Sequence, residues 1–116
     1  MINMNARPRL SIVDLRQATR HAVDYTADAE HRQLGDFKIQ VRNVSARGFM
    51  VEGEIAFDPG ERIQLRLPTI GEIEAYLVWR HGGRLGFQFE RIIRPADFAT
   101  LLLALNPKPI SGKRKV

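Results

Sequence analysis

Residues 62–67 read Arg-Ile-Gln-Leu-Arg-Leu, in which polar and apolar side chains alternate strictly. Successive side chains of a β-strand point to opposite faces of its sheet, so a period of two predicts a strand with one buried face. The same pattern occurs in five other short segments, at residues 22–25, 37–42, 49–51, 73–79 and 85–89. Six short strands at such close spacing predict an all-β domain, either a small six-stranded antiparallel barrel or a sandwich.

Turn-forming residues separate these segments. Residues 58–60 read Asp-Pro-Gly, which favours a tight turn because proline presets its own φ and glycine tolerates the angles that follow. Pro68 has no amide hydrogen to donate to a sheet and is expected to end its strand, with Gly71 closing the turn. Gly82 and Gly83 predict a tight hairpin between the last two strands, because glycine adopts the positive φ that such hairpins require.

The last element has a different period. Pro95 suits the first turn of a helix, and Asn106-Pro107 would stop it, so we expect a helix over residues 95–105. Its apolar side chains fall on one face, namely Phe98, Leu101, Leu102 and Leu105. A helix with one apolar face is expected to cover an open end or face of the barrel.

The 116 residues suffice for one domain with a single modest core. Residues 1–10 show no periodicity and are expected to form a flexible N-terminal arm, and residues 107–116 a flexible basic tail. The domain itself would span residues 11–106. Ser11 resembles a helix cap, so the stretch 15–20 that follows is either a short helix or an extended arm.

Composition points to an anionic partner. The chain has 18 Lys and Arg against 13 Asp and Glu, a formal net charge of +5 and a sequence pI of about 10.2. It has no cysteine, which excludes disulfides and thiolate chemistry and is typical of a cytoplasmic protein. No apolar stretch is long enough for a signal peptide or a membrane span.

Catalytic patterns are weak in this chain. Its three histidines lack metal-ligand spacing, and His31 and His81 are both expected to be exposed bystanders in loops or hairpin ends. No nucleophilic triad and no phosphate-binding loop of the P-loop type occurs. We therefore expect a binding protein rather than an enzyme, with no metal and no cofactor.

Two short motifs carry the binding hypothesis. Arg16-x-x-x-Arg20 sets two guanidinium groups four residues apart, and arginine suits bidentate recognition of phosphate or of a guanine edge. Asn43-x-Ser45-x-x-Gly48 follows after one predicted hairpin and offers an amide, a hydroxyl and a glycine. Asn, Ser and Gly are also ordinary turn residues, so the second motif alone is compatible with a plain strand-entry turn.

Together the two motifs resemble the signatures of the PilZ domain family. Residues 60–65, Gly-Glu-Arg-Ile-Gln-Leu, and residues 85–89, Leu-Gly-Phe-Gln-Phe, are similar to further family patterns, so the resemblance covers about residues 15–105. It implies a six-stranded β-barrel with a C-terminal helix that binds the bacterial second messenger cyclic di-GMP. We further expect signalling to a downstream protein partner, through an arginine arm that folds onto the barrel when the ligand binds.

The resemblance also assigns roles to residues. Arg16 and Arg20 would contact phosphates or guanine, and Asn43 and Ser45 would contact the ligand's polar edges. Gly48 would take a positive φ and let the backbone approach the ligand.

Three further residues are candidates for the same site. Arg47 would add a third cation, and Leu15, an apolar residue where many members carry Arg, would go with one bound ligand rather than two. Trp79 is either a wall of the pocket or a core residue of the fifth strand.

Two other functions remain open at this level. The chain could be a PilZ-like protein–protein adaptor that no longer binds the nucleotide, although the intact motifs argue against it. A general nucleic-acid-binding barrel would suit the net charge, but few aromatic residues are available for base stacking. The oligomeric state is open, with a monomer favoured.

Overall fold

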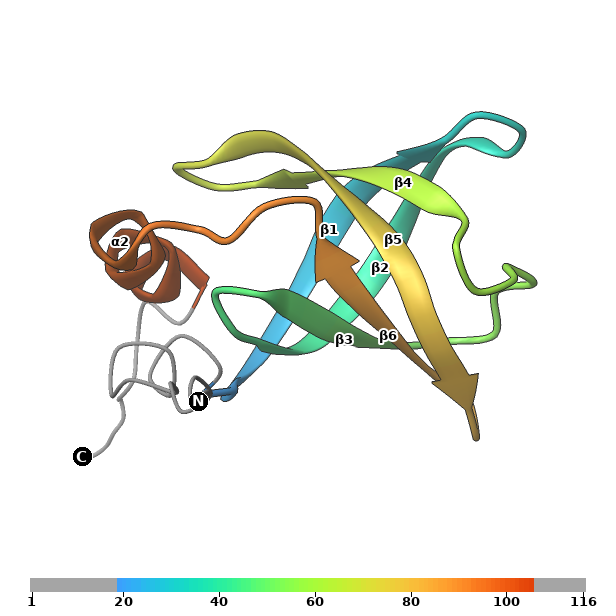
Figure 1. The fold of residues 1–116 in the computed structure, drawn as a ribbon, viewed down its shortest axis with the longest axis horizontal. Coiled ribbons are helices and arrows are strands. Elements are labelled where there is room, and N and C mark those ends of the chain that lie inside the picture. Colours follow the sequence, from blue (N-terminus) through green and yellow to red (C-terminus); the bar gives the residue numbers. More distant parts are fainter. Residues whose placement is uncertain (1–18, 106–116) are drawn as a thin grey trace, which may run out of the picture.

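The computed structural model describes residues 19–105, which form a closed antiparallel barrel followed by one helix (Figure 1). The strands are β1 (His21–His31), β2 (Gly35–Val44), β3 (Gly48–Glu52), β4 (Arg62–Leu67), β5 (Gly71–His81) and β6 (Arg84–Phe89), and the helix is α2 (Pro95–Leu105). The six predicted strands, the barrel and the predicted helix are confirmed. The expectations for residues 1–10, for the stretch from Leu15 to Ala18 and for residues 107–116 concern parts of the chain outside the described residues.

The strand order around the barrel is β1-β2-β3-β6-β5-β4, with β4 closing onto β1. Two of these pairings, β3 with β6 and β4 with β1, join strands that are not consecutive in the chain. The β1–β4 seam is short, with three paired positions from Asp28↔Arg66 to Glu30↔Gln64. Closure gives each strand two neighbours, which reduces the free sheet edge through which small β-proteins associate.

Apolar side chains from alternating strand positions fill the barrel. Phe49 of β3 is fully buried and lies between two rings of β6, stacked on Phe87 with centroids 5.0 Å apart and 5.3 Å from Phe89. Aromatic pairs at such distances add to the stabilisation that burial alone provides. Other buried core side chains from the strands are Val23, Ala27, Ala29, Ile39, Val41, Val44, Val51, Ile63, Leu65, Leu67, Ala75, Leu77 and Leu85.

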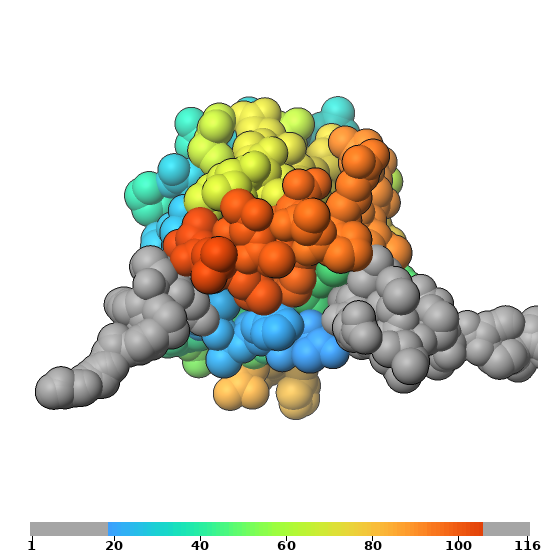
Figure 2. Space-filling view, turned by 90° about the vertical axis from the view of Figure 1, so that its left-hand side faces the viewer, coloured from blue at the N-terminus to red at the C-terminus, as the bar shows by residue number. Residues whose placement is uncertain are grey.

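Helix α2 covers one end of the barrel (Figures 1 and 2). Three of its own side chains, Phe98, Leu101 and Leu105, are buried. The Phe98 ring lies 5.6 Å from the ring of His21 at the start of β1. The three buried side chains are among the four that the sequence assigns to the apolar face, and Leu102 is partly buried beside them. None of the described helical structure is long and apolar enough to cross a membrane.

The opposite end is closed by the loop between β3 and β4. Its Phe57 is buried, stacked on the imidazole of His31 at 4.4 Å and edge-on to Phe37 at 5.8 Å. The prediction that His31 is an exposed loop residue is therefore wrong, since only 6% of it is accessible. The cause is the length of β1, which continues to His31 with the small residues Ala27 and Ala29 on its inner face. Alanine gives a weak strand signal, so the sequence indicates only the first part of this strand.

His31 is held by three hydrogen bonds. Its Nδ1 accepts from the amides of Gln33 and Leu34, both at 3.2 Å, and so carries no hydrogen. Its Nε2 therefore donates to Glu61 Oε1 at 2.8 Å. The amide of Asp58 donates to Glu61 Oε2 at 2.9 Å, which ties the β3–β4 loop to the end of β1.

The predicted turns are also present. The β5–β6 hairpin has a two-residue turn in which Gly82 and Gly83 have φ of 59° and 77°, angles that side chains with a Cβ rarely adopt. In the turn of residues 58–60, the amide of Glu61 donates to the Asp58 carbonyl at 3.0 Å. Strand β4 ends at Leu67, directly before Pro68.

The Glu61 carboxylate predicts a change of stability with pH. The Asp58 amide and the His31 Nε2–H donate to it and hold the pKa of Glu61 below its usual range. The ionised carboxylate thus stabilises the fold above its unfolded-state pKa, and this contribution is lost as pH falls through the folded-state pKa. We expect Glu61→Gln to reduce the free energy of unfolding at pH 6, with the difference from the unmodified protein shrinking between about pH 5 and pH 3.

Urea unfolding at several pH values measures this difference. Glu54→Gln, an exposed change in the same loop, is the matched control and should show no such pH trend. Parallel stability curves for Glu61→Gln and the unmodified protein would contradict the assignment.

Candidate ligand-binding site

The start of β1 and the end of β2 lie side by side, with Ala22 paired to Asn43. This pairing brings together the two predicted motifs. Nη1 of Arg20 donates to Oδ1 of Asn43 at 2.9 Å, although the two residues are 23 positions apart. Arg20 is thus in contact with the barrel through Asn43. Leu15 and Arg16, the other predicted arm residues, lie outside the described residues.

An irregularity in β2 determines where Asn43 points. No residue of β3 pairs with Arg42, which lies between the pairs Val41↔Val51 and Asn43↔Met50. Such an extra residue is a β-bulge and resets the inward–outward alternation of a strand. Val41 and Val44 are both buried, so Arg42 and Asn43 between them are both directed away from the core.

Ser45 organises the turn that follows β2. It is 2% exposed, and its Oγ accepts from the amides of Arg47 at 3.1 Å and Gly48 at 3.2 Å. Its own amide donates to the Gly48 carbonyl at 2.8 Å. A serine hydroxyl used in this way shapes a turn and leaves the neighbouring Arg47 exposed. Direct contact of Ser45 with a ligand stays a prediction.

The prediction that Gly48 takes a positive φ is wrong, because Gly48 is not among the residues with positive φ. Glycine is required here because the backbone of β6 comes very close to its Cα. A Cβ at this position would lie 2.1 Å from the backbone oxygen of Phe87. Only glycine lets the beginning of β3 pair this closely with β6.

Trp79 lies on the outside of the barrel, 41% exposed, so its interpretation as a core residue is wrong. The reason is a second bulge, because the register of β5 against β6 shifts between Leu77↔Phe87 and Trp79↔Gly86. Val78 is the extra residue, and both Val78 and Trp79 are exposed while Leu77 is buried. Strict alternation would have put Trp79 inside with Leu77.

Gly86 gives the indole its position. A Cβ on Gly86 would lie 2.1 Å from Nε1 and 2.3 Å from Cε2 of Trp79, so the indole lies directly against the backbone of β6. The ring fits there because Gly86 has no side chain. The result is an aromatic group on the outer face of β5 and β6.

These residues surround one surface pocket of about 200 Å³. Two arginines, Arg20 and Arg47, line it together with the indole of Trp79. The remaining lining residues are Ser45, Gly48, Val78, Gly86, Phe87 and Gln88. Asn43 does not line the pocket but is hydrogen-bonded to Arg20, which does. Four of the predicted site residues, Arg20, Asn43, Ser45 and Gly48, therefore lie at or beside this pocket. The further candidates Arg47 and Trp79 line it as well.

Charge distinguishes this pocket from three larger ones, because no described carboxylate lines it. A pocket of about 340 Å³ is lined by four, Asp28, Glu30, Asp36 and Glu72. Another of about 650 Å³ is also lined by four, Glu72, Glu74, Glu90 and Asp97. A third larger pocket, of about 260 Å³, is lined by Arg80, Arg84 and Glu54. Of these four pockets, the one at Arg20 and Arg47 alone combines two arginines with no described carboxylate, an arrangement that attracts an anion.

Sequence reasoning missed Gln88, Val78 and Gly86. Gln88 could have been found, because it is the polar residue between Phe87 and Phe89 in an alternating strand and must face outward. Val78 and Gly86 could not, since both depend on the bulge in β5.

The fold and the pocket define a class of structure: a small closed barrel with a surface pocket lined by two arginines and an indole. The described residues contain no group of His, Asp or Glu able to hold a metal ion. A family model for the PilZ domain matches residues 14–105. The chain belongs to the PilZ domain family, a family of cyclic di-GMP receptors whose members are binding modules rather than enzymes.

One solved structure shows the same fold. The chain is similar to the PilZ domain of CeSA from a cellulose-synthesizing bacterium, at 12% identity and a TM-score of 0.55, over 78% of this chain and 97% of that one. It also matches the Bacillus subtilis inhibitor of motility MotI/DgrA, at 23% identity and a TM-score of 0.48, over 79% of this chain and 49% of that one. No curated protein matches the chain by sequence.

The two close-contact glycines predict different outcomes for the same substitution. In Gly48→Ala the new methyl group meets a backbone oxygen that cannot move without separating β3 from β6. We expect this variant to lose about 1–3 kcal/mol of stability, as overpacked interiors do. In Gly86→Ala the three atoms nearest to the methyl group all belong to the Trp79 side chain, which can swing away.

Gly86→Ala should therefore cost less stability but change the emission of Trp79, which is the single tryptophan of the chain. Thermal unfolding and intrinsic fluorescence measure the two effects. Arg84→Ala, an exposed change in the same strand, should alter neither. Unchanged fluorescence in Gly86→Ala would show that the indole does not lie against β6.

Proposed function

We propose that this chain is a receptor for cyclic di-GMP and that the pocket between Arg20, Arg47 and Trp79 is its binding site. One observation carries the proposal. The two family motifs meet at Arg20 and Asn43, beside a pocket that has two cations, an indole and no described carboxylate. The site residues follow from this arrangement together with the family's known ligand.

The polar groups suit guanine and phosphate. The Arg20 guanidinium has donors left after its bond to Asn43 and can bind phosphate oxygens or the O6 and N7 acceptors of guanine. Oδ1 of Asn43 accepts from Arg20, which orients its Nδ2 as a free donor toward a guanine acceptor. Arg47 has no ion-pair partner within the described part of the chain and supplies the second positive charge.

The indole and the size of the pocket suit a single base. Stacking of a base on an aromatic side chain contributes about 1–3 kcal/mol, and half-exposed Trp79 is available for it. Pockets for drug-sized ligands are usually about 300–1,000 Å³, and this one is about 200 Å³. It would hold one guanine, with the phosphates and the second guanine outside it.

The rest of the ligand would then be bound by the other arm residues. Arg16 provides the further guanidinium, and apolar Leu15 goes with one ligand per protomer. Ordering of this arm around the dinucleotide changes the surface beside β1, and a downstream protein partner would respond to that change.

Calorimetry with cyclic di-GMP tests the proposal, and quenching of Trp79 fluorescence provides an independent signal. We expect saturable binding with one ligand per chain. Cyclic di-AMP, which lacks the guanine O6 acceptor, should bind weakly. Single-stranded DNA at physiological salt should not compete. Absence of both heat and fluorescence change at high micromolar cyclic di-GMP would overturn the proposal and favour an adaptor without the nucleotide.

Replacement of Arg20 tests its place in the site. Arg20→Ala removes a charge-assisted contact and releases Asn43, which should cost about 2–3 kcal/mol, or about 30- to 150-fold in affinity. The control is Arg32→Ala, an exposed arginine in the turn between β1 and β2. If Arg20→Ala bound as tightly as Arg32→Ala, Arg20 would not be part of the site.

A further inference from the structure

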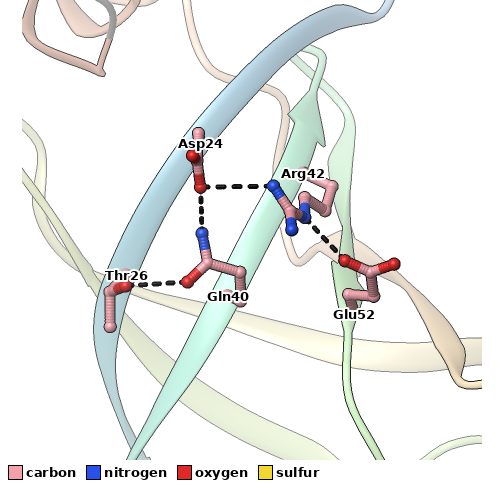
Figure 3. Close-up of polar contacts among 5 residues, drawn as sticks. All are labelled: Asp24, Thr26, Gln40, Arg42 and Glu52. Carbon is pink, nitrogen blue, oxygen red and sulfur yellow. Dashed lines mark hydrogen bonds and ion pairs between the residues drawn. The ribbon is translucent and has the colours of Figure 1, made fainter.

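Asn43 points outward because of the bulge at Arg42, and the Arg42 side chain makes polar contacts with both neighbouring strands (Figure 3). Its Nε donates to Oε1 of Glu52 on β3 at 2.7 Å, and its Nη1 donates to Oδ1 of Asp24 on β1 at 3.3 Å. One guanidinium thus connects three neighbouring strands.

These contacts lie at the places where the register shifts. On the β1 side, two residues, Val23 and Asp24, lie opposite the single residue Arg42. On the other side, no residue of β3 pairs with it. Backbone pairing is therefore incomplete on both sides of Arg42, and its side chain supplies the connections that the ladder lacks there.

Two further hydrogen bonds extend this group, which we name the Arg42 network: Asp24, Thr26, Gln40, Arg42 and Glu52 (Figure 3). Nε2 of Gln40 donates to Oδ1 of Asp24, and Oγ1 of Thr26 donates to Oε1 of Gln40 at 2.8 Å. Asp24 therefore accepts from two donors on β2, which fixes its carboxylate toward Arg42.

We propose that Arg42 is a positioning residue for the ligand site: by pairing with Asp24 and Glu52 it holds the bulge that directs Asn43 toward Arg20. This inference rests on the proposed function for its effect on affinity. Its structural part concerns the protein without ligand and stands alone.

The contribution of this network to overall stability is small. Arg42 is 42% exposed and its partners more so, and exposed ion pairs contribute little to the free energy of unfolding. Its effect is on orientation, because Asn43 is the next residue and its neighbours on both sides, Arg42 and Val44, face opposite ways. Loss of the network would let the bulge relax and Asn43 turn away from Arg20.

A direct contact between Arg42 and the ligand would also make Arg42 important for binding, and the two roles predict opposite results for its partners. The double variant Asp24→Asn/Glu52→Gln removes both negative charges and leaves Arg42 in place. If Arg42 acts by positioning, this variant weakens binding. If Arg42 contacts the dianionic ligand, freeing it from two carboxylates strengthens binding.

Calorimetry with cyclic di-GMP should show that Arg42→Ala and the double variant both bind roughly three- to tenfold more weakly, as expected for residues of one coupled network. Arg42→Lys can pair with only one carboxylate at a time. Its affinity for cyclic di-GMP should therefore lie between that of these variants and that of the unmodified protein. The matched control is Arg66→Ala, which breaks an exposed pair with Glu72 on the regularly paired strands β4 and β5. It should leave affinity unchanged.

NMR of the free protein separates this inference from the proposed function. The side-chain amide resonances of Asn43 should shift in Arg42→Ala and in the double variant, and stay unchanged in Arg66→Ala. Unshifted Asn43 resonances, unchanged affinity in Arg42→Ala or tighter binding by the double variant would each overturn the positioning role. If no variant and not even the unmodified protein bound the dinucleotide, the proposed function would fall, and the Asn43 resonances would still decide the role of Arg42.

Discussion

The close approach of Gly48 to the Phe87 carbonyl is the constraint on which both the barrel and the site depend. No side chain fits between the two strands there, so β3 and β6 pair directly although 37 residues and two other strands separate Gly48 from Gly86 along the chain. The same pairing stacks Phe49 on Phe87 in the core. It also fixes the turn before β3, because the Arg47 carbonyl accepts from the amide of Phe89 at 2.8 Å. One backbone contact thus positions the core and the exposed Arg47 together.

A regular barrel would not have produced this pocket. In an unbroken strand every second residue faces inward, and polar motif residues would alternate between the core and the solvent. The extra residues Arg42 in β2 and Val78 in β5 change that alternation at two places. Each change places one predicted site residue, Asn43 or Trp79, on the outside. Bulges are common next to binding sites for this reason, since they redirect a side chain while the rest of the strand keeps its buried face.

The sequence predicts what depends on local pattern and misses what depends on pairing. A period of two identifies all six strands, and the resemblance of the two motifs to PilZ signatures correctly implies that Arg20 and Asn43 lie together. The position of Trp79 is not predictable in this way, because a bulge leaves no mark on strand periodicity until the register with β6 is known. The burial of His31 is missed for a different reason, since the small inner residues of β1 resemble a loop more than a strand.

Net charge alone would have pointed to the wrong feature of this molecule. The described residues 19–105 contain eleven Lys and Arg and twelve Asp and Glu, so the barrel and helix have no excess of positive charge. Without Arg20 and Arg47, the other described residues contain nine Lys and Arg and twelve Asp and Glu. Screening limits the reach of exposed charges to about 8 Å at physiological salt, so a ligand responds to the groups around it rather than to the total. A small dianion that meets two arginines and an indole at once is attracted by all three. Among the described residues outside the pocket, carboxylates outnumber Lys and Arg, which is why the proposed ligand is a small dianion rather than an extended polyanion.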